Sequence, residues 1–177
     1  MSDSGKLSLA YRAKRMACGA SLLTLGVSFE LASKYSDELK AELAAWDEGR
    51  RVSLSVLPSG PWMNVRKEGG ILRYVGKAEQ PADLKILFKN MDLAFLILTG
   101  MISSTKAFAE HRALVHGSVD QAMEVNRAMA IVQKYLFPEF MLKKGMKRPP
   151  TYSRNDLMVK LRLNASLGLL LAMNAGK

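Results

Sequence analysis

The sequence predicts an α+β domain in which helices flank and cover a sheet. Near both ends of the chain, apolar residues recur every three or four positions, as they do along one face of a helix. Between residues 52 and 88 they recur every second position, in runs separated by glycine and proline, which is typical of short strands. The run Met91–Met101 is almost continuously apolar, so a helix there must be covered on most of its circumference.

The first predicted helix spans Leu7 to about Lys34. Gly19 and Gly26 weaken it, since each costs about 1 kcal/mol relative to alanine. The longest uncharged run within it has 14 residues, fewer than the roughly 20 that a membrane span needs. We therefore expect an amphipathic helix, with an apolar stripe at four- and three-residue steps formed by Leu9, Ala13, Met16, Ala20, Leu23 and Val27.

A second helix and four strands are predicted next. Ser36 can cap a helix that runs to about Trp46. Period-two runs follow near residues 52–56, 63–66, 71–75 and 84–88, with proline or glycine at the corners between them. Strands joined by such short connections favour an antiparallel meander.

The apolar run forms the third predicted helix. Asn90 or Asp92 can cap its start, and Gly100 marks its end or a kink. A hydroxyl within Ser103–Thr105 can cap a short fourth helix. A fifth short strand is predicted around Leu114 and Val115.

Two further helices complete the predicted elements. Ser118 and Gln121 have the spacing of a capping box and open a helix that ends before Pro138. Asp156 is the predicted cap of a last amphipathic helix over residues 157–173.

The charge of the chain indicates an anionic partner. The formal net charge is +10, and residues 141–162 contribute seven bases against one acid. Such a balance attracts acidic lipid surfaces, acidic ligands or nucleic acid, and the net charge does not indicate which of these partners binds. A solvated basic tail explains the cluster equally well. Cys18 is the single cysteine, which fits a reducing compartment and leaves no pair for a disulfide.

Motifs for catalysis or metal binding are weak. The glycines of residues 70–78 are spaced wrongly for a phosphate loop, and Ala78 stands where Ser or Thr would hold magnesium. His111 and His116 have no cysteine nearby and fit surface positions better than a metal site. We therefore predict no enzyme, no metal and no cofactor. Nucleic-acid binding is not favoured, because exposed aromatics and a reading helix are missing from the pattern.

The order of elements and several local motifs resemble the sterol carrier protein type two domain. The resemblance covers about residues 36–137 and departs from the family at residues 110–112, where a glycine is usual before the fifth strand. The residues that carry it are Ala82–Phe88, Asp92 with Phe95 and Leu98 leading to Thr99-Gly100, then Met101, Ala107-Phe108, Leu114–Gly117 and Ala122-Met123.

The resemblance implies a five-stranded mixed, mostly antiparallel sheet covered by helices that enclose an apolar tunnel for a lipid. The family carries sterols, fatty acids, acyl-CoA or isoprenoid-quinone intermediates. Three regions follow: an N-terminal amphipathic helix at 1–35, the lipid-binding domain at 36–140, and a basic linker with a C-terminal amphipathic helix at 141–177. The expected lipid-binding residues are Phe88, Met91, Phe95, Leu98, Met101, Ile102, Phe108, Met123, Met129 and Val132.

Polar positions complete the predicted site. Lys106, His111 and Arg112 are placed at the tunnel mouth, where they could hold a polar head, although solvated turn residues are an equal interpretation. Contact with an anionic membrane is assigned to Lys143, Lys144, Lys147 and Arg148.

The function expected from the sequence is a lipid carrier or presenter. It would hold an apolar chain (fatty acyl, sterol or quinone-like) and exchange it at a membrane surface, as a cytoplasmic, peripherally membrane-associated protein. The alternative is a non-catalytic accessory subunit whose terminal helices bind a protein partner or a second copy of the chain.

Overall fold

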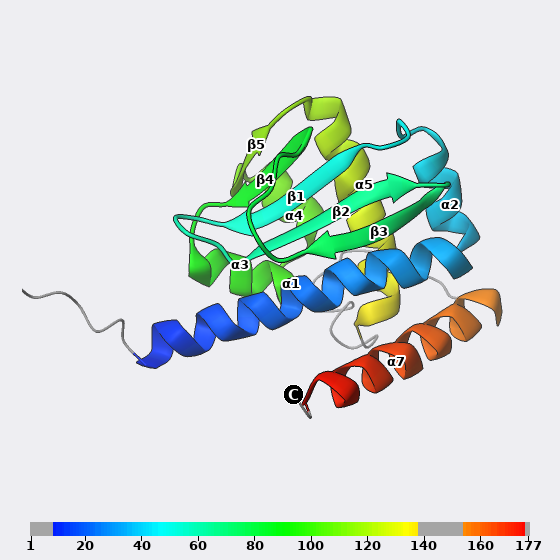
Figure 1. The fold of residues 1–177 in the computed structure, drawn as a ribbon. Coiled ribbons are helices and arrows are strands. Elements are labelled where there is room, and N and C mark those ends of the chain that lie inside the picture. Colours follow the sequence, from blue (N-terminus) through cyan, green and yellow to red (C-terminus); the bar gives the residue numbers. More distant parts are fainter. Residues whose placement is uncertain (1–8, 138–153, 176–177) are drawn as a thin grey trace, which may run out of the picture.

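The computed structural model describes residues 9–137 and 154–175 and places one sheet among helices (Figure 1). In the view of Figure 1, α4 and α5 lie behind the sheet, α1 runs along its lower edge beside β3, and α7 lies below α1. In chain order the elements are α1 Leu9–Tyr35, α2 Asp37–Ala44, β1 Arg51–Val56, β2 Trp62–Glu68, β3 Ile71–Gly76, β4 Leu84–Phe88, α3 Met91–Leu98, α4 Ser104–Ala109, β5 Ala113–His116, α5 Val119–Leu136 and α7 Arg154–Ala175.

The sheet has five strands in the order β3-β2-β1-β4-β5. β1 pairs with β4 in parallel, and the other three pairs are antiparallel. The predicted α+β class with a mixed, mostly antiparallel sheet is confirmed.

The predicted simple meander is wrong at the fourth strand. Residues 77–83 carry the chain across to the free edge of β1 instead of turning back beside β3. β4 is buried at four of its five positions, whereas β3 has exposed positions along its length. A strand buried on both faces is favoured inside a sheet, and this explains why β4 lies between β1 and β5.

Three predicted helix caps are confirmed. Ser36, Asn90 and Ser103 each have an extended backbone, and each side chain accepts a hydrogen bond from the backbone amide three residues later. They satisfy one of the free amides at the start of α2, α3 and α4 respectively. Asn90, rather than Asp92, is the cap of the apolar helix.

The predicted caps of α5 and α7 are wrong. Ser118 precedes α5 but makes no side-chain capping hydrogen bond, so the predicted capping box does not form. α2 ends at Ala44, two residues before Trp46. α7 begins at Arg154, so Asp156 lies inside its first turn and caps nothing. Its carboxylate instead accepts a hydrogen bond from the Tyr135 hydroxyl at 2.8 Å, which ties α7 to α5.

α1 is a core helix whose buried face differs from the predicted stripe. Its most buried apolar residues follow four- and three-residue steps on another side of the helix, and they face β2, β3 and α3. On the predicted stripe, Leu9 and Met16 are 83% and 76% exposed. The residues of the buried stripe are Cys18, Leu22, Leu25, Phe29 and Ala32.

One glycine lets α1 approach the sheet closely. A Cβ at Gly26 would lie 2.5 Å from Tyr74 Cδ2 and 2.9 Å from Met63 Cγ, inside van der Waals contact. The hydrogen at this position therefore lets the helix backbone rest on side chains of β2 and β3.

α1 also has the length and composition of a membrane-crossing helix, and no other helix in the described ranges does. Of its most apolar window, 44% is buried inside the protein. A core helix passes the same test, and the packing of α1 on the sheet is that of a core helix.

α7 packs across α1 and α5. Val159, Leu163 and Leu167 are 7%, 1% and 7% exposed and share one face at four-residue spacing. They join the same apolar cluster as the buried residues of α1 and of the sheet. Both terminal helices thus contribute to a common core, while the regional boundaries at residues 35 and 140 stay predictions.

A buried ion-pair cluster fixes α5 to the start of β1. The Arg50 guanidinium, whose side chain is 6% exposed, donates to Glu124 at 2.5 Å and to Asp47 at 2.7 Å. Burial alone would lower the pKa of Arg50, but the hydrogen bonds with Asp47 and Glu124 outweigh it and raise the pKa. Removing either acidic partner would leave a buried charge with less compensation.

Candidate functional site

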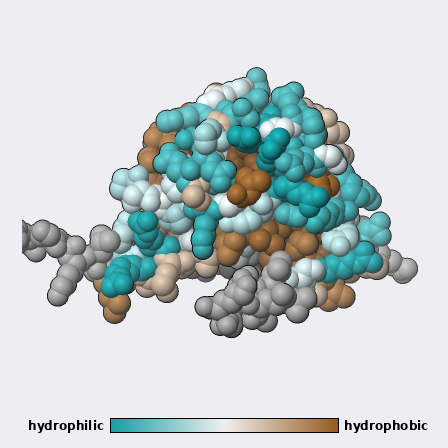
Figure 2. Space-filling model, in the orientation of Figure 1, coloured by the Kyte–Doolittle hydropathy of each residue, from teal (hydrophilic) through white to brown (hydrophobic). Residues whose placement is uncertain are grey.

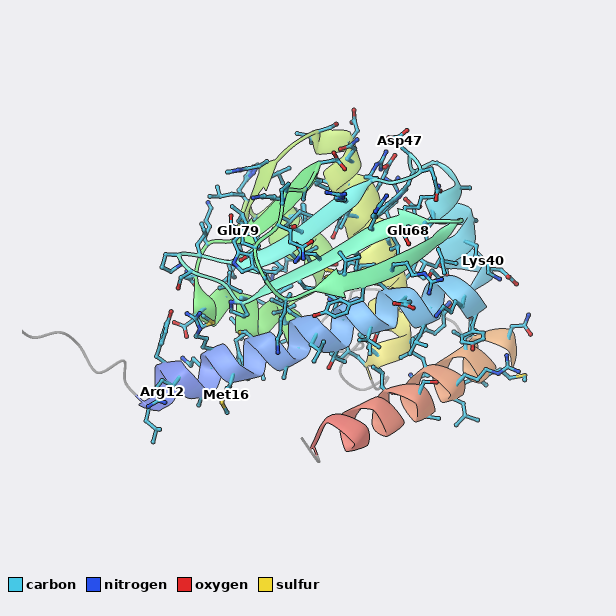
Figure 3. The ribbon with its side chains drawn as sticks, viewed as in Figure 1. Arg12, Met16, Lys40, Asp47, Glu68 and Glu79 are labelled. Atoms are coloured by element: carbon cyan, nitrogen blue, oxygen red, sulfur yellow. The ribbon has the colours of Figure 1, made fainter. Side chains whose placement is uncertain are left out.

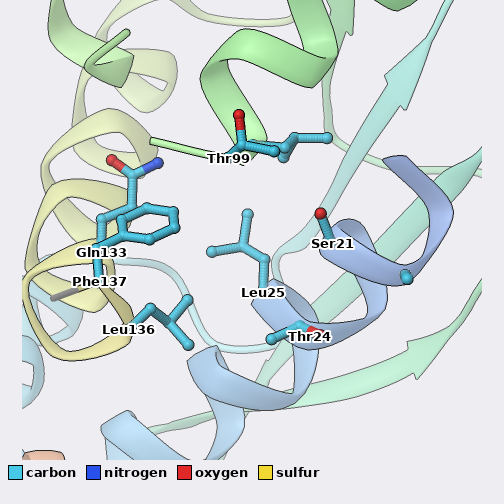
Figure 4. A pocket seen from close by; sticks show the side chains of 9 residues that line it. Ser21, Thr24, Leu25, Thr99, Gln133, Leu136 and Phe137 are labelled. Carbon is cyan, nitrogen blue, oxygen red and sulfur yellow. The ribbon is translucent and has the colours of Figure 1, made fainter. Parts of the chain in front are cut away.

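The candidate site is a cavity of about 410 Å³ between α1, the end of α3 and the end of α5 (Figure 4). In the close-up, Gln133, Leu136 and Phe137 stand on one side, Ser21, Thr24 and Leu25 on the other, and Thr99 above. A volume of this size lies within the usual range of small-molecule sites. The residues that line it are Ala20, Ser21, Thr24, Leu25, Leu98, Thr99, Gln133, Leu136 and Phe137.

The wall between α3 and α5 depends on Gly100. This residue has φ +74°, the left-handed conformation that commonly ends a helix. A Cβ there would lie 3.0–3.2 Å from three atoms of the Phe137 ring. Glycine at position 100 therefore allows the left-handed turn and also leaves room for Phe137 to pack against the end of α3.

The lining of the cavity is mainly apolar and carries no formal charge. Its large apolar side chains are Leu25, Leu98, Leu136 and Phe137, and none of the nine lining residues is Asp, Glu, Lys, Arg or His. An apolar chain can enter such a space without stripping water from an ion.

The polar groups of the lining come from all three elements. Ser21 and Thr24 belong to α1, Thr99 follows α3, and Gln133 belongs to α5. Thr99 Oγ1 donates to the backbone oxygen of Phe95 at 2.6 Å, so its proton is committed while its oxygen can still accept. This pattern of an apolar wall with a few polar groups is typical of ligand sites.

The predicted lipid-binding residues only partly coincide with this cavity. Leu98 lines it, and the other nine lie elsewhere. Met101 and Met123 are 60% and 43% exposed, so they face solvent. Phe88, Met91, Met129 and Val132 are buried in the core, and Phe95, Ile102 and Phe108 are partly buried against it. Whether these residues touch a ligand stays a prediction.

The predicted mouth residues lie around the turn between α4 and β5, and none of them lines the cavity. Glu110 pairs with Lys106 at 3.8 Å and also accepts a hydrogen bond from Arg112. His111 is exposed and has φ +51°, a conformation uncommon outside glycine. The four lysine and arginine residues predicted to contact a membrane, at 143–148, lie outside the described residues.

α1 is the wall that sequence reasoning missed. Four of the nine lining residues come from it, although the sequence indicated a helix outside the lipid-binding domain. The sequence carries a second apolar stripe, from Cys18 to Ala32, with the four- and three-residue spacing of a buried helix face, but the stripe from Leu9 to Val27 has the same spacing.

A polar cluster beside the cavity holds the first turns of α7. Tyr135 donates to Asp156 at 2.8 Å and lies 3.0 Å from the Ser36 hydroxyl. Burial, together with the hydrogen bond to Asp156, raises the pKa of Tyr135 to about 12. Lys134 pairs with both Asp156 and Glu38 at 3.1 Å.

The α5 residues of this cluster, Lys134 and Tyr135, lie on the same turn as the lining residues Gln133 and Leu136. Lys160 of α7 donates to the backbone oxygen of Phe137 at 3.1 Å, and the Asn164 side-chain amide donates to the backbone oxygen of Tyr135 at 3.4 Å. α7 therefore braces the end of α5 that forms one side of the cavity. Within the described ranges, no group of three or more His, Cys, Asp or Glu side chains is arranged to hold a metal ion.

No protein-family model matches the chain, and no curated protein matches it. Among solved structures it is similar to the UbiJ-SCP2 ubiquinone synthesis protein, with 14% identity, a TM-score of 0.44 and coverage of 63% of this chain and 92% of the other. A conserved hypothetical protein of Thermus thermophilus gives 16% identity and a TM-score of 0.45, over 62% and 86% of the two chains. The sterol carrier protein domain 2 of Helicoverpa armigera gives 14% and 0.41, over 60% and 84%.

These similarities agree with the resemblance to sterol carrier protein domains found in the sequence. The cavity and the surface of this chain are the basis for its proposed function.

Proposed function

We propose that this protein is a lipid carrier or presenter that holds an apolar chain in the cavity between α1, α3 and α5. The observation that carries the proposal is a mainly apolar, uncharged cavity of about 410 Å³ with a few polar groups on its wall. A cavity with this lining binds by withdrawing apolar surface from water, and no bond chemistry is needed.

The size of the cavity fits a lipid chain. A dry, apolar cavity of about 150 Å³ holds one benzene molecule. On that scale, about 410 Å³ has room for on the order of fifteen carbon atoms. Ten buried methylenes would contribute about 8 kcal/mol before ordering costs.

We further propose that the protein exchanges its ligand at an anionic membrane surface. Met16 and Arg12 project from α1 away from the sheet (Figure 3), and Met16 is 76% exposed. In Figure 2, hydrophilic residues dominate the visible face, and a hydrophobic band follows its lower side where α1 passes. Exposed apolar side chains beside bases, on a chain of net charge +10, fit the surface of an acidic bilayer.

α7 adds a second exposed apolar group on the face opposite its buried one. Leu157, Met158 and Leu161 are 54%, 55% and 72% exposed. A helix that is apolar on two sides favours a partner on the outer side. An accessory subunit that binds a protein or a second copy of the chain through this face is the alternative function.

The proposed location is the cytoplasm, with peripheral attachment to a membrane. Cys18 is fully buried and is the only cysteine of the chain, which suits a reducing compartment.

The carrier proposal is tested by native mass spectrometry of the purified full chain, followed by delipidation and titration with Nile red. We expect a bound lipid that extraction removes, and dye uptake by the emptied protein. Thr24→Phe fills the cavity from α1 and should lower dye uptake several-fold. Ala13→Phe, on an exposed part of α1 away from the cavity, is the matched control.

Two results would overturn the proposal. One is a protein that carries no lipid and takes up no dye. The other is equal dye uptake by Thr24→Phe and Ala13→Phe. A complex with an unrelated protein, together with an empty cavity, would instead support the accessory-subunit alternative.

A further inference from the structure

Three arginines lie side by side on the face of the sheet that points away from the helices. Arg51 of β1 is opposite Arg66 of β2, and Arg66 is opposite Arg73 of β3. Val65 and Leu72, which precede the second and third arginines, are 1% and 0% exposed and belong to the core. Because successive side chains of a strand alternate between faces, the arginines point to the other face. In Figure 1 this is the near face, and no helix of the described residues covers it.

This arginine row, formed by Arg51, Arg66 and Arg73, is unfavourable for the sheet by itself. Neighbouring strands are about 4.8 Å apart, and like charges directly opposite one another are destabilising. Arg66 pairs with Glu68 at 3.3 Å and Arg73 with Glu30 at 3.2 Å, whereas Arg51 makes no ion pair with any residue that the structure describes. Such exposed ion pairs contribute little. The Arg66 and Arg73 side chains are still 40% and 47% exposed, so a partner can reach them.

The surrounding surface is also basic. The strand positions on this face carry four bases and one acid, which are Arg51, Arg66, Arg73 and Lys85 against Glu68. Two further acids lie at its border. Glu79 pairs with Lys85 at 3.3 Å, and Asp83 accepts a hydrogen bond from the backbone amide of Arg51 at 2.8 Å. The excess of bases on the strands favours an anionic partner.

The other side chains of this face favour an acidic protein over a nucleic acid. Sheets that bind single-stranded nucleic acid stack its bases on several exposed aromatic rings. Among the positions of the five strands on this face, Trp62 is the only Trp, Tyr or Phe, and Lys85 Nζ lies 5.5 Å from the centroid of its ring.

The spacing of the arginine row matches that of acidic side chains on a helix. Glutamates four residues apart on a helix are about 5–6 Å apart, close to the separation of neighbouring strands. A helix that crosses the strands can therefore present one carboxylate to each arginine. A guanidinium binds a carboxylate through two parallel hydrogen bonds, which makes arginine well suited to this contact.

We propose that the arginine row is a docking surface for an acidic helix of a partner protein, with carboxylates at positions i, i+4 and i+8 facing Arg51, Arg66 and Arg73. The row lies on the side of the sheet opposite α4 and α5. A partner docked there leaves α1, α3 and α5 uncovered, so the inference is independent of the carrier function and of the alternative partner face on α7.

The test uses two fluorescein-labelled, alanine-based peptides of identical length and composition, each with three glutamates. In the first they stand at i, i+4 and i+8 on one face of the helix, and in the second at i, i+5 and i+10, spread around it. Fluorescence anisotropy with the full chain at 50 mM NaCl measures binding, and circular dichroism checks that the peptides are equally helical. We expect the first peptide to bind at least about fivefold more tightly, with weaker binding at 300 mM NaCl.

A double variant tests the row directly. Arg51→Gln with Arg73→Gln removes both ends of the row, and it should weaken binding of the first peptide at least about fivefold. Lys40→Gln with Arg127→Gln is the matched control. It removes the same net charge from α2 and α5, where the two side chains are 47% and 54% exposed, and should change the affinity less than about twofold.

Equal binding of the two peptides by wild type would overturn the inference, and this comparison needs no variant to fold. An equal loss of binding in the two double variants would also overturn it, because net charge alone would then explain the binding. Labelled polyuridylate is the third probe. If it binds more tightly than the first peptide, and the Arg51→Gln, Arg73→Gln variant loses that binding, the face belongs to a nucleic acid and the acidic-helix partner is refuted.

Discussion

Two glycines of α1 allow a direct test of how that helix packs. Gly26 and Gly19 both lie inside the helix, and replacing either with alanine should gain about 1 kcal/mol of helix propensity. Their surroundings differ. A Cβ at Gly26 would lie 2.5 Å from Tyr74 Cδ2, whereas a Cβ at Gly19 would lie 3.6 Å from Pro61 Cβ, an ordinary contact.

The expected effects on stability are of opposite sign. Overpacking of a core typically costs about 1–3 kcal/mol. For Gly26→Ala this cost exceeds the propensity gain, and we expect a net loss of about 1 kcal/mol. Gly19→Ala keeps the gain, so its free energy of unfolding should rise by about 1 kcal/mol. The two variants should therefore differ by about 2 kcal/mol, or about 4–8 °C in Tm for a chain of this size.

The assay is urea unfolding of both variants and wild type, followed by circular dichroism, with equal m-values as the condition for comparing midpoints. If both variants gain the same stability, Tyr74 and Met63 do not confine Gly26. α1 would then not rest on β2 and β3 as described, and the α1 wall of the cavity would be placed wrongly. A Gly19→Ala protein less stable than Gly26→Ala would refute the same packing.

Three other predictions concern single side chains. Cys18 is fully buried, and burial together with the nearby Asp92 charge raises its pKa to about 11. We therefore expect the native protein not to react with Ellman's reagent at pH 8, and one thiol to react in urea. A fast reaction of the native protein would show that α1 opens. Because the pKa of Tyr135 is raised from 10.0 to about 12 in the folded state, its contribution to stability is complete below about pH 10 and is lost as the pH rises through 12. The urea midpoint should fall over that range, and Tyr135→Phe should flatten the fall; an unchanged slope in the variant would contradict the assignment. On anionic vesicles, Met16→Ser should reduce flotation several-fold, because it removes an exposed apolar side chain of α1. Leu114→Ser on β5, where Leu114 is 41% exposed, is the matched control, and an equal loss there would refute a specific membrane face.

The elements were predictable because their signals are local. Caps such as Ser36 and Asn90 act on amides three residues away, and the alternation of β1 and β3 is visible in short stretches of sequence. The order of the strands was not predictable in this way. The parallel pairing of Val52–Val56 with Leu84–Phe88 joins segments about thirty residues apart, and no local turn records it.

The methionines show why the site was predicted less well than the fold. Met129 and Met91 are 0% and 5% exposed and fill the core, while Met101 and Met123 face solvent. A flexible thioether suits a core gap, a ligand wall or a surface equally well, so its presence in a helix does not locate a cavity.

α1 shows most directly why the buried face of a helix could not be predicted from the sequence, because this helix carries two apolar stripes with the same spacing. Steps of four and three residues connect Leu9 to Val27 on one stripe and Cys18 to Ala32 on the other, so periodicity alone cannot say which stripe is buried. The choice is made by Gly26, which permits the close contact with Tyr74, a residue 48 positions away in sequence. Once that contact selects the second stripe, the N-terminal part of the first has no intramolecular cover within the described residues. This packing of α1 thus forms one wall of the cavity and leaves Leu9 and Met16 exposed nearer the start of the helix, so that a change that rotates α1 should alter ligand uptake and membrane binding together.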